Sequence, residues 1–360
     1  MTTEESAPNA ARALTADREY SCIVTEYVGN EQEVLRLRNA SRDNPETREY
    51  VDWRYQTPPG SPGPKVFWLV SASGERVGMA SLIFRRYWCN GSPVHVAVLG
   101  DISVAQSLRG RGLGQRLLRF TTEYLSEHFS DCYGFVIPTE AARRSLAAVG
   151  WSTAGELIPH VLAIDPAPQL RALLRSVWLT QRICQIYRSL ARVLLRRHLM
   201  KDSTLQFVSE PDEALGELWR SSPKDGRVMR DLGVQTLTWR YATHPHTRFT
   251  FVKLMRGGEL RAFMVLTLDA QSRTCSIYDV LANSTADLSC ILAQYAIGAM
   301  ERRDVSTLRI SVNDKHPYRR SIRMLGFVPR LPGSAPLQGH PRSATGERTP
   351  RSITSGDKDV

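Results

Sequence analysis

The residues best suited to chemistry in this sequence form one short glycine-rich stretch. Gly110, Gly112 and Gly114 occupy every second position, and Arg109 and Arg111 stand beside them. Glycine has no Cβ, so the backbone can turn tightly and direct successive N–H groups at one point. The two arginines add positive charge. The stretch therefore predicts a binding site for phosphate.

A strand before this loop and a helix after it are expected to position the phosphate. The strand is an apolar run from Val94 to Leu99 that leads through residues 100–104 into the loop. Past the loop, a pattern with helical period runs through Leu113, Leu117, Leu118, Thr121, Tyr124, Leu125 and His128. The first turn of a helix carries unsatisfied N–H groups and the positive end of the helix dipole, and both favour an anion.

Three kinds of nucleotide-binding loop differ in the spacing of their glycines. A P-loop needs Gly-Lys-Ser/Thr, but Gly114 is followed by Gln115-Arg116, and a dinucleotide fold needs G-x-G-x-x-G. The stretch 102–114 instead resembles the signature of the GNAT superfamily of acyl-CoA N-acyltransferases, Q/R-x-x-G-x-G/A after a strand reading L-x-V. Arg109, Gly112 and Gly114 fill its three fixed places. A glycine-rich loop without a ligand is the alternative.

This resemblance implies which residues would bind the co-substrate, acetyl-CoA. The loop would grip the pyrophosphate of coenzyme A, and the strand would face the thioester, with the Val104 backbone toward its carbonyl. Backbone donors placed in this way stabilise an oxyanion. The implied acetyl-CoA-binding residues are Ile102, Val104, Arg109, Gly110, Arg111, Gly112, Leu113, Gly114 and Gln115.

The sequence also offers candidates for the catalytic base and acid. Asp101 lies beside Ile102 and is the candidate base for the acceptor amine; the alternative is that it caps or orients the loop. Family members often carry a tyrosine that protonates the leaving thiolate, but its place holds Leu146. Ser145 and Tyr133 are the available substitutes, and structural roles suit both. His95 and His160 stand alone in apolar strands and are interpreted as structural.

The composition sets wider bounds on function. The chain has 360 residues, a net charge of +11 and 42% hydrophobic residues, as in a globular protein with an anionic partner. The six cysteines show neither paired spacing nor clustering with histidine, so a disulfide framework or a metal site is not expected. The acidic start, residues 1–5, is unlike a secretory signal, and a cytoplasmic location is expected. No nucleic-acid-binding pattern is present.

The elements expected in the first half are a strand, two helices, three strands, a helix, a strand, a helix and a strand, an order similar to that of a GNAT domain. The resemblance implies an α/β fold with two GNAT-like domains, each a mixed twisted sheet flanked by helices. Trp53-Arg54-Tyr55 recurs as Trp239-Arg240-Tyr241, and Asp101 has a counterpart in Asp279. The second half lacks the loop glycines and is interpreted as a degenerate domain without a CoA site. The expected divisions are a disordered 1–18, a GNAT domain 19–165, a helical linker 166–202, the degenerate domain 203–330 and a disordered tail 331–360.

The linker has an unusual charge pattern. Residues 166–201 contain eight Arg or Lys and no Asp or Glu, interleaved with apolar residues at helical spacing. A basic amphipathic helix of this kind suits an anionic membrane surface. The alternative is an interdomain helix that packs on one or both halves with its arginines in solvent.

We expect an N-acetyltransferase that transfers an acyl group other than an aminoacyl group to an amine. The acceptor class is a small amine, an amino sugar of a glycan or a peptide amine. Two other functions fit parts of the sequence. One is a CoA-binding sensor or scaffold, which the missing tyrosine allows. The other is a tandem GNAT aminoacyl transferase that uses charged tRNA, and the intact loop argues against it.

Overall fold

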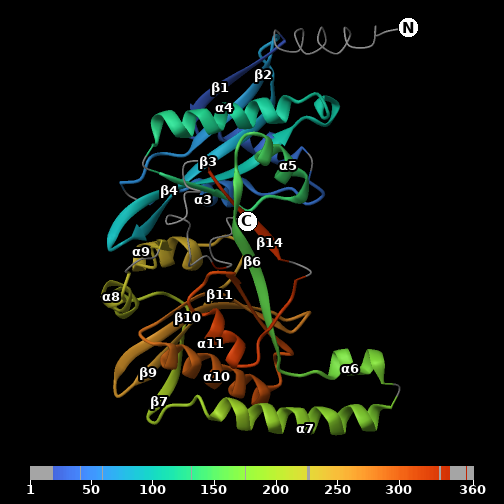
Figure 1. Ribbon diagram of the computed structural model, residues 1–360, viewed down its shortest axis with the longest axis vertical. Helices are drawn as coiled ribbons and strands as arrows, with labels where there is room; N and C mark the ends of the chain where they lie inside the picture. Colours follow the sequence, from blue (N-terminus) through green and yellow to red (C-terminus); the bar gives the residue numbers. More distant parts are fainter. Residues whose placement is uncertain are drawn as a thin grey trace, which may run out of the picture. The chain divides into compact units, whose positions relative to one another are not determined.

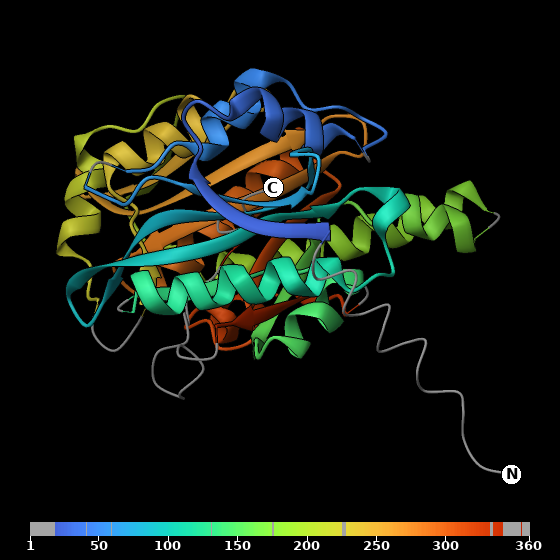
Figure 2. The same ribbon diagram turned by 90° about the horizontal axis from the view of Figure 1, so that it is seen from above.

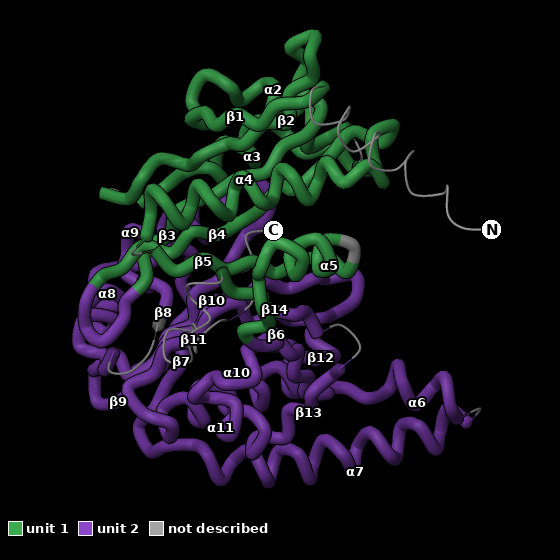
Figure 3. The backbone as a smooth tube through the Cα atoms, turned by 45° about the horizontal axis from the view of Figure 1, so that its top comes forward, with its two compact units in different colours: residues 1–87, 93–154, 337–349 green, residues 88–92, 155–336, 350–360 purple. Residues whose placement is uncertain are grey.

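The computed structural model describes residues 19–40, 42–58, 60–130, 132–174, 176–224, 228–331, 334–340 and 354. These residues form two compact units (Figure 3). Unit 1 comprises residues 1–87, 93–154 and 337–349, and unit 2 comprises residues 88–92, 155–336 and 350–360. The expected disordered segment 1–18 lies outside the described residues.

Unit 1 has the element order that the sequence predicts: a strand, two helices, three strands, a helix, a strand, a helix and a strand. The bounds are β1 Tyr20–Glu26, α2 Glu31–Asn39, α3 Arg48–Tyr55, β2 Lys65–Ser71, β3 Arg76–Cys89, β4 Ser92–Val104, η1 Gln106–Leu108, α4 Leu113–His128, β5 Tyr133–Val136, α5 Glu140–Ala148 and β6 Ser152–Ala163. The last strand, β6, leaves unit 1 after Ala154 and continues in unit 2.

Both faces of the unit 1 sheet are covered by helices. Because side chains alternate along a strand, Trp68 of β2 packs toward α2 and α3, whereas Phe67 packs toward α4. Helix α4 runs along its face of the sheet (Figures 1 and 2). It buries Leu117, Leu118 and Leu125, three positions of the predicted helical stripe. This packing fixes the direction of α4 and therefore the position of its first turn.

Strands β4 and β5 are parallel neighbours for only three residues. Their pairing runs from Val96 opposite Tyr133 to Val98 opposite Phe135, and β5 ends at Val136. Strand β4 continues to Val104. The two strands therefore part before β4 reaches the glycine-rich loop.

Unit 2 repeats this order of elements. After α6 Ala167–Leu173 and α7 Val177–Arg196 come β7 Ser203–Val208, α8 Glu213–Ser221, β8 Val228–Arg230, α9 Val234–Leu237, the π-helix η2 Thr238–Ala242, β9 Thr250–Arg256, β10 Glu259–Asp269, β11 Thr274–Ala282, α10 Thr285–Arg302, β12 Thr307–Asn313, α11 Arg319–Met324 and β13 Val328–Pro329. The last strand of the chain, β14 Ala335–Gly339, lies in unit 1 from residue 337. Strands β11 and β12 are parallel, as β4 and β5 are. The predicted repeat is therefore present in the structure.

Each unit takes its last strand from the other half of the sequence. In unit 2, β6 pairs antiparallel with β12 from Leu157 to Ala163. In unit 1, β14 pairs antiparallel with β5, placing Gln338 opposite Val136. The prediction of a disordered tail from 331 is wrong for residues 335–339, which are a strand. The predicted boundary at 165 also falls after the strand that joins unit 2.

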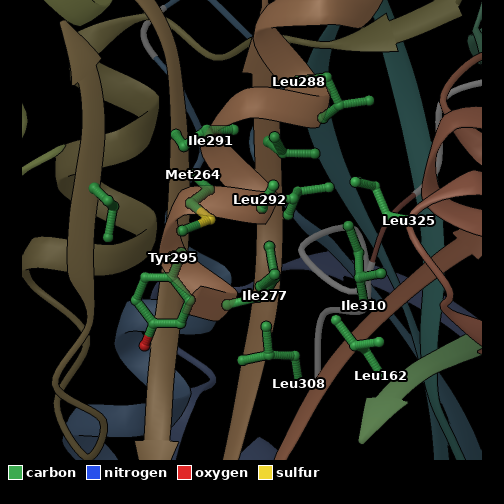
Figure 4. Close-up of a cluster of buried hydrophobic side chains, with 14 of the residues drawn as sticks. Leu162, Met264, Ile277, Leu288, Ile291, Leu292, Tyr295, Leu308, Ile310 and Leu325 are labelled. Atoms are coloured by element: carbon green, nitrogen blue, oxygen red, sulfur yellow. The ribbon is translucent and has the colours of Figure 1, made fainter. Parts of the chain in front are cut away.

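The core of unit 2 is built around α10 (Figure 4). Leu288, Ile291 and Leu292 of this helix belong to one buried cluster with Ile277 of β11 and Leu308 of β12. Most of the α10 side chains are buried. This helix is therefore a core element, whereas α4, its counterpart in unit 1, is amphipathic.

Candidate active site

The glycine-rich loop has the backbone conformation expected of a phosphate site. Gly110 has φ +80° and Gly112 has φ +77°, in the left-handed region that favours glycine. A Cβ built on either residue would meet no atom within 4 Å. Packing therefore does not require glycine at these positions. Backbone conformation does, and the space beside both residues is open for a ligand.

The first turn of α4 begins at a residue that cannot cap it. Gly112 is the N-cap residue, and no side-chain cap is found there among the described residues. The Arg116 N–H donates to the Gly112 carbonyl at 3.1 Å. The N–H groups of residues 113–115 precede the first possible helical bond, so they face outward from the helix end. With Arg111 and Gln115 exposed, this end of α4 fits an anionic group such as a pyrophosphate.

Strand β3 holds the entry to the loop in place. The Ala105 N–H donates to the Val77 carbonyl at 2.8 Å. A Cβ on Gly78 would lie 2.9 Å from the Ser103 carbonyl, so a larger residue there would push β3 away from β4. The Arg109 Nε donates to the Val104 carbonyl at 3.2 Å. The loop arginine thus ties the loop to the end of β4.

These contacts also determine where the Val104 backbone points. Ser103 and Ala105 direct polar groups toward β3. Backbone direction alternates along a strand, so Val104 directs its N–H to the opposite side, where β5 has already ended. This is the orientation that the predicted role toward a thioester carbonyl requires. The Val104 side chain lies 3.8 Å from a Cβ built on Gly114, and Leu113 is buried beside it.

Asp101 is buried and paired. Its φ is +54°, within β4, and its side chain is only 2% exposed. Its Oδ1 forms ion pairs with Arg38 and, at 3.3 Å, with Arg54. Its Oδ2 accepts hydrogen bonds from the Tyr55 hydroxyl at 2.6 Å and the Ser81 hydroxyl at 3.2 Å. This carboxylate connects β4 to α2, α3 and β3.

This geometry argues against the predicted role of Asp101 as the base. A base needs an oxygen that faces the substrate and gains from protonation, but both oxygens here are occupied, and two guanidinium groups favour the charged form. The alternative stated from the sequence, that Asp101 orients the loop, fits the contacts. Sequence reasoning noted Tyr55 only as part of a repeat and missed Arg38 and Ser81. The recurrence of Trp-Arg-Tyr together with the aspartate was the available signal.

The second half contains the same pairing. The Tyr241 hydroxyl donates to Asp279 Oδ2, and Arg230 forms an ion pair with the same carboxylate. The Thr354 hydroxyl donates to Asp279 Oδ1 at 2.7 Å. Because the pairing recurs in a half without the glycine loop, it belongs to the framework of each unit rather than to acyl transfer alone.

The helix that corresponds to α4 is closed by its own side chains. Ser284 is the N-cap of α10; its hydroxyl accepts from the Asp287 N–H at 3.0 Å and donates to the Asp287 carboxylate at 2.6 Å. Asp287 is fully buried, and Arg256 and Arg261 lie 3.6 and 3.5 Å from its oxygens. A protein carboxylate therefore occupies the end of α10, where α4 offers room for a ligand.

The position at which GNAT family members often carry a catalytic tyrosine, here Leu146, lies in the core. Leu146 is fully buried and packs with Leu117 and Leu118. Thr139 begins α5, and its hydroxyl accepts from the Ala142 N–H at 3.3 Å. Tyr133 is buried and Ser145 half-buried. None of these positions presents an exposed phenol.

The two lone histidines lie in strands. His160 is fully buried, its Nδ1 is 2.9 Å from the Ile158 carbonyl, and burial lowers its pKa. Burial also lowers the pKa of His95. Within the described residues, no group of three or more His, Cys, Asp or Glu could hold a metal ion. Among the helices of that same part of the chain, none combines the length and apolarity needed to cross a bilayer.

The fold resembles those of known proteins. Residues 32–151 match the model of the acetyltransferase (GNAT) family. No curated protein matches the sequence. A probable N-acyltransferase of unknown function from Enterococcus faecalis V583 is 10% identical, with TM-score 0.63, over 91% of this chain and 75% of its own. A GCN5-related N-acetyltransferase from Anabaena variabilis is 12% identical, with TM-score 0.62, over 89% and 72%.

A tandem GNAT protein from the clavulanic acid biosynthesis pathway also shares the fold. It is 14% identical, with TM-score 0.51, over 89% of this chain and 98% of its own. The family match of residues 32–151 and the repeated fold define a class: a tandem arrangement of two domains with the GNAT fold. Residues 32–151 match the GNAT family, and the chain as a whole shares the fold of the GNAT proteins compared above.

Proposed function

We propose that this protein is an acetyl-CoA-dependent N-acetyltransferase whose only CoA site lies in unit 1. The observation that carries the proposal is the uncapped end of α4, bordered by two left-handed glycines with open space beside them. The site residues are those predicted from the sequence: Ile102, Val104 and residues 109–115. Acetyl-CoA would supply an activated acyl group at this site.

The residues of the chain would perform three tasks. The N–H groups of residues 113–115 and the charge of Arg111 would bind the pyrophosphate. The Val104 N–H would point at the acyl carbonyl from the side of β4 that β5 leaves uncovered. The Asp101 cluster would hold the bend of β4 that aims Val104. Preorganised donors of this sort contribute about 3–4 kcal/mol each in enzymes where one has been removed.

The acceptor is proposed as an amine: a small amine, an amino sugar or a peptide amine. The amine must lose a proton, and the leaving thiolate must gain one. With Asp101 occupied by arginines, we propose that water takes the amine proton. A non-catalytic CoA sensor is the second candidate, favoured by the buried Leu146 in the place of the acid.

One experiment separates these functions. Isothermal titration with CoA measures binding, and thiol release measured with DTNB against a panel of amines and amino sugars measures turnover. Binding together with turnover on at least one amine supports the acetyltransferase. Binding without turnover across the panel supports the sensor. Absence of CoA binding would contradict both.

A further inference from the structure

Helix α7 exposes a continuous apolar stripe. Leu179, Ile183, Ile186, Leu190 and Val193 follow each other at intervals of four and three residues, which places them on one face of a helix. Ile186 and Leu190 are each 61% exposed. Leu194 extends the stripe, and Trp178 is exposed at the start of the helix. Unpaired apolar surface of this length is uncommon on a helix that packs only within its own chain.

A different face of α7 anchors it to unit 2. Thr180, Cys184 and Leu195 are buried. The Tyr187 hydroxyl donates to the Ala163 carbonyl at 2.7 Å. Helix α7 packs on α10 within unit 2 (Figure 3). The alternative stated from the sequence, a helix that packs on one half with its arginines in solvent, describes this face, and the packing in unit 2 leaves the apolar stripe exposed.

The charges around the stripe have one sign. Residues 166–201 carry eight Arg or Lys and no acidic residue. Arg182 and Arg196 are separated by two heptads, so they lie along one flank of the stripe. Within the described residues, neither has a carboxylate within ion-pair distance, and the only such contact of an α7 arginine joins Arg188 to Asp165 at 3.9 Å. Their charge is available to an external anion.

We propose that the exposed face of α7 is a docking surface for an anionic lipid bilayer. An apolar stripe flanked by arginines is the pattern of a helix that lies in the plane of a membrane interface, with its side chains among the acyl chains and its cations at the headgroups. The stripe would place unit 2 on the membrane without a spanning segment. This inference is independent of the proposed acetyl transfer, because it concerns no residue of the unit 1 site.

A second copy of the chain is the other occupant that the spacing suggests. Intervals of four and three residues also describe a coiled-coil seam. Self-pairing of α7 would bring guanidinium groups together without any carboxylate from the helix to offset them. Charge complementarity therefore favours an anionic surface, and a dimer becomes an outcome of the test.

The test uses the full chain and vesicles of two compositions: equal parts phosphatidylglycerol and phosphatidylcholine, and phosphatidylcholine alone. Flotation should recover the protein with the anionic vesicles and much less with the neutral ones, and high salt should reduce the recovery. The Ile186→Glu/Leu190→Glu variant should bind at least about tenfold more weakly. The control Leu268→Glu/Val328→Glu places two charges on other exposed apolar residues of unit 2 and should bind as wild type does.

A second variant tests the electrostatic part. Arg182→Gln/Arg196→Gln should weaken binding to anionic vesicles and leave the circular dichroism spectrum unchanged. The proposal is overturned if the wild-type chain does not float with anionic vesicles, or if the Glu variant floats equally well. It is also overturned if light scattering shows a wild-type dimer that Ile186→Glu/Leu190→Glu converts to a monomer, since the stripe then binds a second copy.

Discussion

The Tyr55 hydroxyl donates a hydrogen bond to Asp101 Oδ2 at 2.6 Å across 46 residues of sequence, and Tyr241 makes the same bond to Asp279. In both units the tyrosine ends a Trp-Arg-Tyr sequence, and the aspartate lies in the strand that leads to the long helix. Complete burial raises the pKa of Tyr55, so the phenol remains a donor at neutral pH. The pair holds a helix against the bent strand in each unit.

Removing one hydroxyl from this pairing should affect the two units differently. Tyr55→Phe should lower the free energy of unfolding by about 1.5–3 kcal/mol, the usual contribution of a hydrogen bond to a charged group. It should also weaken CoA binding, because Asp101 lies three residues before Val104. Tyr241→Phe is the matched control. It should lose a comparable amount of free energy of unfolding, measured by urea denaturation, and keep its CoA affinity in titration calorimetry. Equal CoA affinities for both variants would argue that the cluster has no influence on the loop.

Asp101→Asn tests the positioning role against the role of base. Breaking a buried ion pair costs about 3–5 kcal/mol, so the variant should be less stable and bind CoA more weakly. The shape of its pH-rate profile should match that of the wild type. A base would behave differently: turnover would fall roughly 100- to 10,000-fold at constant CoA affinity and recover as pH rises. That second pattern would restore Asp101 as the base.

Gly112→Asp should abolish CoA binding. A residue with a Cβ at φ +77° costs about 1 kcal/mol, and the new carboxylate would repel the pyrophosphate at the end of α4. Gly74→Asp is a matched control, because Gly74 has φ +83° and the same open surroundings in the hairpin between β2 and β3. The control should lose similar stability and keep its CoA affinity in titration calorimetry. Unchanged affinity in Gly112→Asp would refute the assignment of the site.

The local parts of this site were predictable from the sequence. The glycines at 110 and 112 indicate left-handed backbone, and helical spacing gave both the extent of α4 and its buried face. The partners of Asp101 were not predictable, because Arg38 and Ser81 come from distant elements and have no local pattern. Nor was β14, since a short segment with proline and glycine becomes a strand only through pairing with β5. For α7, the spacing showed amphipathicity but not which face stays exposed.

The structure also predicts a pH dependence of stability from His244. Burial, and then the charge of Arg240, lowers the pKa of His244 to about 4. Between pH 6.5 and 4 the unfolded chain therefore binds a proton that the folded chain does not, and the free energy of unfolding falls as the pH falls. Since this side chain is only partly buried, we expect a loss of about 1 kcal/mol from pH 7 to pH 5.

The variant His244→Asn tests this origin. Nδ1 of His244 accepts from the N–H groups of His246 and Thr247 at 3.2 and 3.0 Å, and the side-chain oxygen of an asparagine can accept these hydrogen bonds in place of Nδ1. The variant should show a smaller difference between urea unfolding at pH 7 and at pH 5. His128→Asn, at an exposed position of α4, should keep the wild-type difference. If His244→Asn leaves the difference in free energy of unfolding between pH 7 and pH 5 unchanged, the pH dependence comes from other groups.

We expect the chain to bind one CoA, at the site in unit 1. In unit 1 the end of α4 has no side-chain cap, whereas in unit 2 the buried carboxylate of Asp287 lies at the end of α10 with Ser284 and two arginines. A pyrophosphate at α10 would have to displace a carboxylate that is already bonded and paired. Residues 282–287 also lack glycine, so the backbone cannot readily gather its N–H groups there.

Titration calorimetry of the wild type should give a stoichiometry near one CoA per chain, and Gly112→Asp should remove all of the heat of CoA binding. Ser284→Ala, which removes the cap, should lower the free energy of unfolding by about 1 kcal/mol and leave the stoichiometry at one. A stoichiometry near two, or binding that persists in Gly112→Asp, would show that unit 2 retains a site of its own.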